Sequence, residues 1–119
     1  MEKTIRGDHE LFLLGFGAST GDADYALYPL FHSKNQGAPG NRSFYSNGKI
    51  DNLLDEARRE LKVKKRKELY TEVQNILQDE LPILTLYYDF QTIGTSKNIE
   101  GIKVHPSGAS DFKNISYKL

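Results

Sequence analysis

Residues 15–24 carry the side chains that come nearest to a catalytic arrangement. The sequence GASTG at 17–21 matches the G-x-S-x-G pattern, in which a serine at a sharp strand-to-helix turn acts as the nucleophile. That chemistry also needs an oxyanion-hole loop before the serine, and only 18 residues precede Ser19. A helix should follow the serine directly, whereas Gly21 and Asp22 delay it. A serine hydrolase built on Ser19 is therefore kept as an alternative interpretation.

The same small-residue loop does not fit the nucleotide-binding patterns. Gly15, Gly17 and Gly21 lack the G-x-G-x-x-G spacing, and no lysine follows to complete a phosphate-binding loop. Asp22 and Asp24 stand two positions apart at the start of an expected helix, where capping and the helix dipole account for both carboxylates. The interpretation that we favour is a ligand-facing loop, in which the missing side chains let a bound molecule reach the backbone.

Composition argues against several other classes of function. Basic and acidic residues number 16 each, so no net charge attracts nucleic acid, and the basic run 62–67 lacks interleaved aromatic residues. That run is interpreted as a solvated helix face. The chain has no cysteine, and its histidines, His9, His32 and His105, lack the spacing of metal ligands. We expect no metal, no cofactor and no nucleic-acid partner.

The elements that position this loop are predicted from hydrophobic patterning. Residues 9–16 form a continuous apolar run, which favours a strand buried on both faces. Helical spacing of apolar residues over 24–32 predicts a helix that Asp22 or Asp24 caps. The stretch 33–48, rich in Gly, Asn, Pro and Ser, predicts a long ordered loop.

Two amphipathic helices are predicted next. Asn47 is expected to cap the first, whose apolar positions run from Ile50 to Leu61. Pro82 is expected to end the second, with Leu81 before it already in an extended conformation. The apolar face of the second helix comprises Leu69, Val73, Ile76 and Leu77.

The last third of the chain is predicted to form strands. Residues 83–90 are β-branched, leucine and aromatic, which favours a second buried strand. Weaker strand candidates lie at 102–105 and 114–118, joined by a turn at 106–110. The expected order is one strand, three helices and three strands.

Three segments together resemble the C-terminal part of the extracytoplasmic solute-binding proteins of dipeptide and oligopeptide ABC transporters (bacterial solute-binding protein family 5). They are DHELFLLGFGASTGDADYALYPLFHS, NRSFYSNGKIDNLLDEARRE and KRKELYTEVQNILQDELPILTLYY. The similarity runs over essentially the whole chain. The same family contains binders of nickel, haem and glutathione.

The resemblance implies a fold class and a domain organisation. The expected fold is α/β (mixed α+β), a C-terminal lobe fragment of a bilobal periplasmic-binding-protein type II fold. Residues 1–119 are then a single fragment of the ligand-binding C-terminal lobe, with the N-terminal lobe and the signal sequence outside this chain. Such proteins close on their ligand by hinge motion between two lobes.

The resemblance also implies a function without catalysis. The chain would be part of the substrate-binding component of an ABC importer that captures a peptide or peptide-like solute, such as an oligopeptide, a dipeptide or glutathione. Its partners would be that ligand and the permease subunits, and its place would be extracytoplasmic, in the periplasm or at the cell surface as a lipoprotein. Apolar strands cut from a larger sheet would also favour self-association.

The candidate ligand-binding residues follow from the resemblance. Ser19 aligns with the position at which many members carry an aspartate that pairs with the peptide amine, and Phe16 stands where tryptophan is usual. Asp22 takes the aspartate's place only if the loop is shifted by about three residues. A second loop near the cleft contributes Arg42 and Tyr45, unless Tyr45 packs on the helix that follows. The remaining candidates, through their backbone groups and hydroxyls, are Gly17, Ala18 and Thr20.

Overall fold

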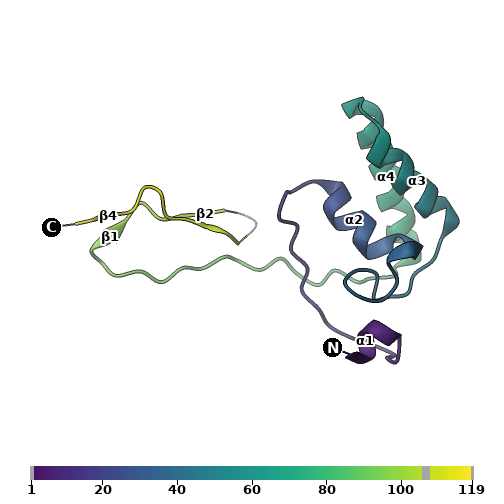
Figure 1. The fold of residues 1–119 in the computed structure, drawn as a ribbon, viewed down its shortest axis with the longest axis horizontal. Coiled ribbons are helices and arrows are strands. Elements are labelled where there is room, and N and C mark those ends of the chain that lie inside the picture. Colours follow the sequence, from purple (N-terminus) through teal and green to yellow (C-terminus); the bar gives the residue numbers. More distant parts are fainter. Residues whose placement is uncertain (1, 106–107, 119) are drawn as a thin grey trace. The chain divides into compact units, whose positions relative to one another are not determined.

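The computed structural model describes residues 2–105 and 108–118, which contain both helices and strands. The chain divides into two compact units, Met1–Thr85, called here the helical unit, and Leu86–Leu119, called the strand unit. The predicted mixture of helix and strand is confirmed (Figure 1). None of the helices in the described residues is both long and apolar enough to cross a membrane.

The helical unit contains four α-helices and one short 3-10 helix. The three predicted helices are confirmed as α2, α3 and α4. Asn47 caps α3 by accepting hydrogen bonds from the N–H groups of Lys49 and Ile50 at 2.9 and 3.3 Å. The N-terminal helix α1 was not predicted, because five residues are too short for an apolar period to show. The elements are α1 (Glu2–Arg6), α2 (Ala23–Phe31), η1 (Ser33–Asn35), α3 (Gly48–Arg59) and α4 (Val63–Glu80).

The hydrophobic core lies where α2, α3 and α4 pack together. On α3, Ile50, Leu54 and Ala57 are completely buried, as their i, i+4, i+7 spacing predicts. Leu61 continues that spacing but is 94% exposed, because α3 ends at Arg59 and the connection to α4 turns away from the core. The other buried apolar residues of the core are Phe31, Leu69, Tyr70 and Val73.

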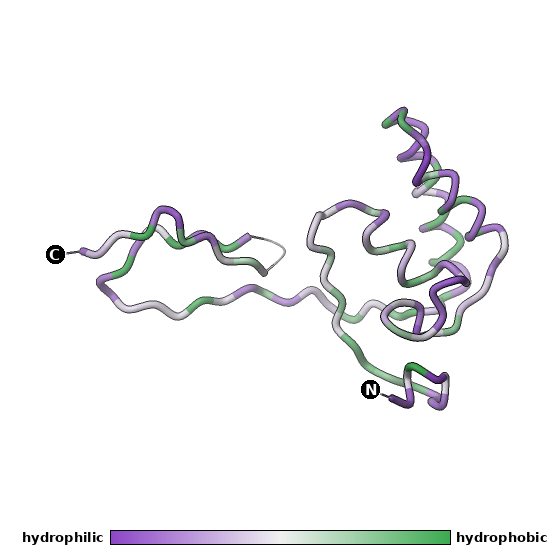
Figure 2. The backbone as a smooth tube through the Cα atoms, in the orientation of Figure 1, coloured by the Kyte–Doolittle hydropathy of each residue, from purple (hydrophilic) through white to green (hydrophobic). Residues whose placement is uncertain are grey.

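The prediction of two buried strands is wrong. Residues 9–16 and 83–90 are extended but form no strand, and their apolar side chains are largely exposed, with Leu11 at 91% and Tyr88 at 91%. Figure 2 shows the first of these segments as a hydrophobic stretch between α1 and α2. A strand buried on both faces needs paired neighbours and covering layers, and the described residues supply neither for these segments. Self-association through them stays a prediction.

Leu81 was predicted to be extended because a proline follows it, and this prediction is wrong. Its φ of 46° and ψ of 50° place it in the left-handed region, and its N–H donates to the carbonyl of Leu77. Proline disfavours the right-handed helical conformation of the preceding residue. A left-handed residue also ends the helix, and it satisfies one more carbonyl of the last turn. The end of α4 before Pro82 is confirmed.

The described residues of the strand unit form two short antiparallel pairs. Strand β1 (Ile99–Glu100) pairs with β4 (Ser116–Tyr117), and β2 (Lys103–Val104) pairs with β3 (Ser110–Asp111). The predicted strands at 102–105 and 114–118 are therefore confirmed as β2 and β4, although they pair with two strands that were not predicted. The predicted turn at 106–110 falls partly on residues 106–107, which lie outside the described residues.

Gly101 is required at the crossing between these pairs. Its φ is 86°, and a side-chain Cβ there would overlap the carbonyl oxygen of Asn114. Only glycine combines this conformation with so close an approach of two backbone segments.

Candidate functional site

The loop predicted to face a ligand is open and free of bulky contacts. Phe16 is 48% exposed, and Ser19 and Thr20 are exposed as well. A Cβ added at Gly15 or Gly17 would meet no atom within 4 Å. The backbone of this loop is therefore accessible, which is the property that the absence of large side chains predicts.

Asp22 anchors the C-terminal end of this loop. Its carboxylate caps α2 by accepting a hydrogen bond from the Asp24 N–H at 2.8 Å. The same carboxylate accepts two hydrogen bonds from the Arg66 guanidinium, Nη1 to Oδ2 at 3.0 Å and Nη2 to Oδ1 at 2.7 Å. The Asp22 N–H donates in turn to the Thr20 hydroxyl at 3.3 Å. The hydrogen bonds from Arg66, and then from the Asp24 N–H, lower the pKa of Asp22.

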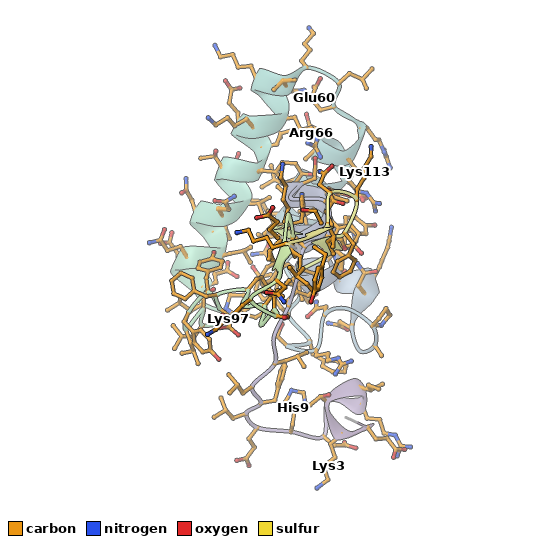
Figure 3. The ribbon with its side chains drawn as sticks, turned by 90° about the vertical axis from the view of Figure 1, so that its left-hand side faces the viewer. Lys3, His9, Glu60, Arg66, Lys97 and Lys113 are labelled. Atoms are coloured by element: carbon orange, nitrogen blue, oxygen red, sulfur yellow. The ribbon has the colours of Figure 1, made fainter. Side chains whose placement is uncertain are left out.

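Arg66 connects three helices at one corner of the helical unit. Besides Asp22 it contacts the end of α3, where Nε donates to the Ala57 carbonyl at 3.3 Å, and its guanidinium lies 4.9 Å from the ring centre of Tyr70. Figure 3 labels Arg66 and Glu60, which lie toward the same end of the α3–α4 pair. The hydrogen bond to Asp22 raises the pKa of Arg66.

Asp24 adds a second set of contacts at this corner. Its carboxylate accepts a hydrogen bond from the Tyr70 hydroxyl at 3.3 Å and lies 3.2 Å from Nε of Arg58. Arg58 also stacks over the ring of Tyr28, with 3.9 Å between guanidinium carbon and ring centre. The role of Arg66 was not predicted, because Arg66 was interpreted as part of the solvated basic run 62–67. The one sequence signal for the ion pair is that acidic residues begin α2 whereas basic residues begin α4.

The serine hydrolase interpretation gains no support from the geometry. Ser19 follows an extended segment that is not a strand, so the strand-to-helix turn of that motif is absent. In the described part of the chain no residue forms a hydrogen bond with the Ser19 side chain, so no histidine is positioned there as its base.

The second predicted loop, which contains Arg42 and Tyr45, is built around Asn41. Asn41 is completely buried. Its side-chain amide donates to the Tyr45 carbonyl at 2.8 Å, and its Oδ1 accepts from the Ser43 hydroxyl at 2.9 Å and from the Tyr45 N–H at 3.2 Å. Arg42 donates through Nη1 to the Thr4 hydroxyl in α1 at 3.2 Å. No periodic pattern of residues indicates the role of Asn41, because that role depends on the fold of an irregular loop.

Tyr45 packs against the core and ties the loop to the end of α4. Its ring meets Phe31 edge to face, with centroids 6.3 Å apart, and its hydroxyl donates to Glu80 Oε2 at 2.6 Å. Burial, and then the hydrogen bond to Glu80, raises the pKa of Tyr45 to about 12. Packing on the helical core was the alternative stated for this residue.

The Tyr45–Glu80 contact makes stability depend on pH in the alkaline range. A tyrosine pKa raised by folding contributes stability that is complete below the usual value of about 10 and is lost as pH rises through about 12. We expect Tyr45→Phe to lower the free energy of unfolding at neutral pH, and the difference from wild type to shrink above pH 10. Urea unfolding at several pH values measures this difference. Tyr25→Phe, at an exposed tyrosine of α2, is the control, and an equal pH dependence in both variants would contradict the assignment.

The candidate residues fall into two groups that are anchored at opposite ends of α4. Asp22 contacts Arg66 in the first turn of α4, and Tyr45 contacts Glu80, its last residue. At about 1.5 Å of rise per residue these two anchors lie roughly 20 Å apart along the helix axis. Two shallow depressions lie elsewhere, one lined by residues 93–104 and one on the exposed face of α4.

His32 is a buried polar residue between the two loops. Its Nδ1 accepts a hydrogen bond from the Lys34 N–H at 3.1 Å, so Nε2 carries the proton. Nε2 lies 3.5 Å from Asp55, and Nδ1 lies 3.5 Å from Asp51. Among the described residues no group of three metal-ligating side chains is formed. His32 caps η1 through its hydrogen bond with the Lys34 N–H, and its ring lies 4.6 Å from that of Tyr28, centre to centre.

No family model matches the chain. The chain is 35% identical over 109 residues to the glutathione-binding protein GsiB of Salmonella typhimurium (strain LT2), which covers 91% of this chain and 21% of that protein. It is 34% identical over 105 residues to the glutathione-binding protein GsiB of Escherichia coli (strain K12), which covers 87% of this chain and 20% of that protein. The chain thus spans about a fifth of the length of the curated relatives that it matches.

Proposed function

We propose that this chain is part of a solute-binding protein of an ABC transporter and takes part in capturing a peptide or peptide-like solute for uptake; its similarity to glutathione-binding proteins supports this. The observation that carries the proposal is the similarity to glutathione-binding proteins over nine-tenths of the chain. Glutathione is the first ligand to test. In this role the chain performs no chemistry on the solute.

The remaining parts of the proposal follow from the same premise. In this proposal the working protein has a bilobal fold, and this chain contributes part of its C-terminal lobe. It functions outside the cytoplasm, in the periplasm or as a lipoprotein at the cell surface, and delivers its ligand to permease subunits.

The ligand contacts that we propose lie in the loop 16–20. Backbone groups at Gly17 and Ala18, the hydroxyls of Ser19 and Thr20, and the exposed ring of Phe16 are its accessible groups. None of them carries a charge, and the Asp22 carboxylate is already paired with Arg66. The N–H groups and hydroxyls can donate to the carboxylate and carbonyl oxygens of a peptide, and the loop offers no unpaired carboxylate for its ammonium group. Arg42 and Tyr45 hold the second loop in place through their contacts with Thr4 and Glu80, and in this proposal they contribute to ligand binding only secondarily.

Glutathione titrated into the 15N-labelled chain tests this proposal by NMR. We expect shifts confined to residues 16–20, with weak affinity, because the chain contains only part of a two-lobed cleft. Gly17→Val should abolish the shifts without unfolding the protein, since its Cβ meets no atom within 4 Å but would cover the exposed backbone. Gly94→Val, the same change at another open position, is the control. Tight binding, or shifts that ignore Gly17→Val, would overturn the proposed site.

A further inference from the structure

Arg66, in α4, anchors Asp22, which lies just after the ligand-facing loop 16–20. The Arg66 side chain donates four hydrogen bonds at once, two to the Asp22 carboxylate, one to the Ala57 carbonyl and a long one to the Tyr70 hydroxyl at 3.4 Å. Asp22 then links Arg66 to Thr20 through the hydrogen bond from its N–H to the Thr20 hydroxyl. A contact made at the start of α4 therefore reaches a candidate ligand-binding side chain in two steps.

The rest of the loop has little else to fix it. The Gly21 N–H donates to the Ala18 carbonyl at 3.4 Å, which is a long hydrogen bond, and Gly21 has a φ of 67° and open space around it. Within the described residues the Ser19 side chain forms no hydrogen bond. Because glycine and small residues give the loop many accessible conformations, its order depends on the anchor at Asp22.

We propose that Arg66 is a positioning residue for the ligand-facing loop, which it fixes through Asp22 while removing the free negative charge that a ligand would otherwise meet there. This inference rests on the proposed function for its meaning, since the loop is the proposed ligand contact. The planar guanidinium is essential to it, because a lysine ammonium cannot form the two parallel hydrogen bonds and reach Ala57 as well.

Arg66→Lys tests the proposal without removing the positive charge. We expect the amide hydrogens of Gly21 and Asp22 to exchange roughly two- to fivefold faster, as the loss of a partly exposed ion pair predicts. Amides of the core, such as that of Val73, should keep their exchange rates. Arg59→Lys is the matched control, an arginine-to-lysine change near the same corner at an exposed side chain that forms no hydrogen bond or ion pair with the described residues.

Two further readouts separate positioning from a general loss of stability. The carboxyl pKa of Asp22, followed by 13C NMR, should rise toward its usual value in Arg66→Lys, since the hydrogen bond from Arg66 is the main cause of its lowering. Asp22→Asn retains an oxygen that caps α2, and adding it to Arg66→Lys should change loop exchange no further. Unchanged exchange at Gly21 and Asp22 in Arg66→Lys would overturn the proposal.

Glutathione binding distinguishes this inference from the proposed function. If the wild-type chain shows shifts at 16–20, Arg66→Lys should weaken binding at least twofold and Arg59→Lys should not; equal binding by wild type and Arg66→Lys would overturn the positioning role. A different outcome is that glutathione causes no shifts in the wild-type chain while the Gly21 and Asp22 amides exchange faster in Arg66→Lys. In that case the proposed ligand is wrong, and the role of Arg66 in ordering the loop is supported.

Discussion

Replacing Leu54 by alanine is expected to lower the free energy of unfolding of the helical unit by about 3 kcal/mol. Leu54 is completely buried on α3, in the cluster that also contains Phe31 and Val73. The substitution removes apolar surface that folding hides from water, and it leaves a cavity that helices packed from both sides cannot close fully. Urea unfolding followed by far-UV circular dichroism measures the loss.

Leu61→Ala is the matched control for this prediction. It is the same chemical change seven positions along the chain, at a leucine that is 94% exposed, and we expect a loss of less than about 0.5 kcal/mol. The helical periodicity of the sequence assigns both leucines to one apolar face. Equal losses in the two variants would show that α3 extends beyond Arg59 in solution and that the core is larger than the structure has it.

The helices could be predicted because their signals are local. The apolar spacing of Ile50, Leu54 and Ala57 and the cap at Asn47 each depend on residues within a few positions, and all were confirmed. The limit of such reasoning is visible at Leu61, where the periodicity continues past the end of the helix. Nothing in a repeat of apolar residues tells where the backbone turns.

The strands could not be predicted in the same way. An apolar run such as 83–90 indicates which residues would be buried if a sheet were present, but pairing is set by residues far away in the chain. In the described residues these runs have no strand partner and remain exposed. The short strands β1 and β3 were missed because Ser110–Asp111 contains no apolar residue and Ile99–Glu100 contains only one, so neither shows a strand pattern.

The candidate site was predicted only in part, because polar contacts are not periodic. Asp22 was assigned correctly as a cap of α2, whereas its bidentate partner Arg66 lies 44 positions away and was grouped with the lysines around it. Asn41 likewise appeared as one polar residue in a polar loop. Asn41 is buried by the fold of the loop around it, which no local pattern of residues indicates.

Replacing Asn41 by alanine is expected to lower the free energy of unfolding by about 2–3 kcal/mol, although the residue is polar and lies in a loop. The change removes the acceptor of the Ser43 hydroxyl and the Tyr45 N–H, and the donor to the Tyr45 carbonyl. Groups left without partners away from water carry their full desolvation cost. Asn41→Ala should therefore exceed most surface substitutions in effect, as measured by urea unfolding.

Asn52→Ala provides the control, because Asn52 is exposed on α3 and its side chain forms no hydrogen bond with the described residues. Alanine favours helix there, so stability should change by less than about 0.5 kcal/mol. Hydrogen exchange adds a second test, since loss of Asn41 should speed exchange of the Tyr45 amide while the Gly21 amide stays unchanged. Faster exchange at both would contradict the separate anchoring of the two loops at opposite ends of α4. A loss below about 1 kcal/mol would show that water replaces the amide and that the loop does not depend on this residue.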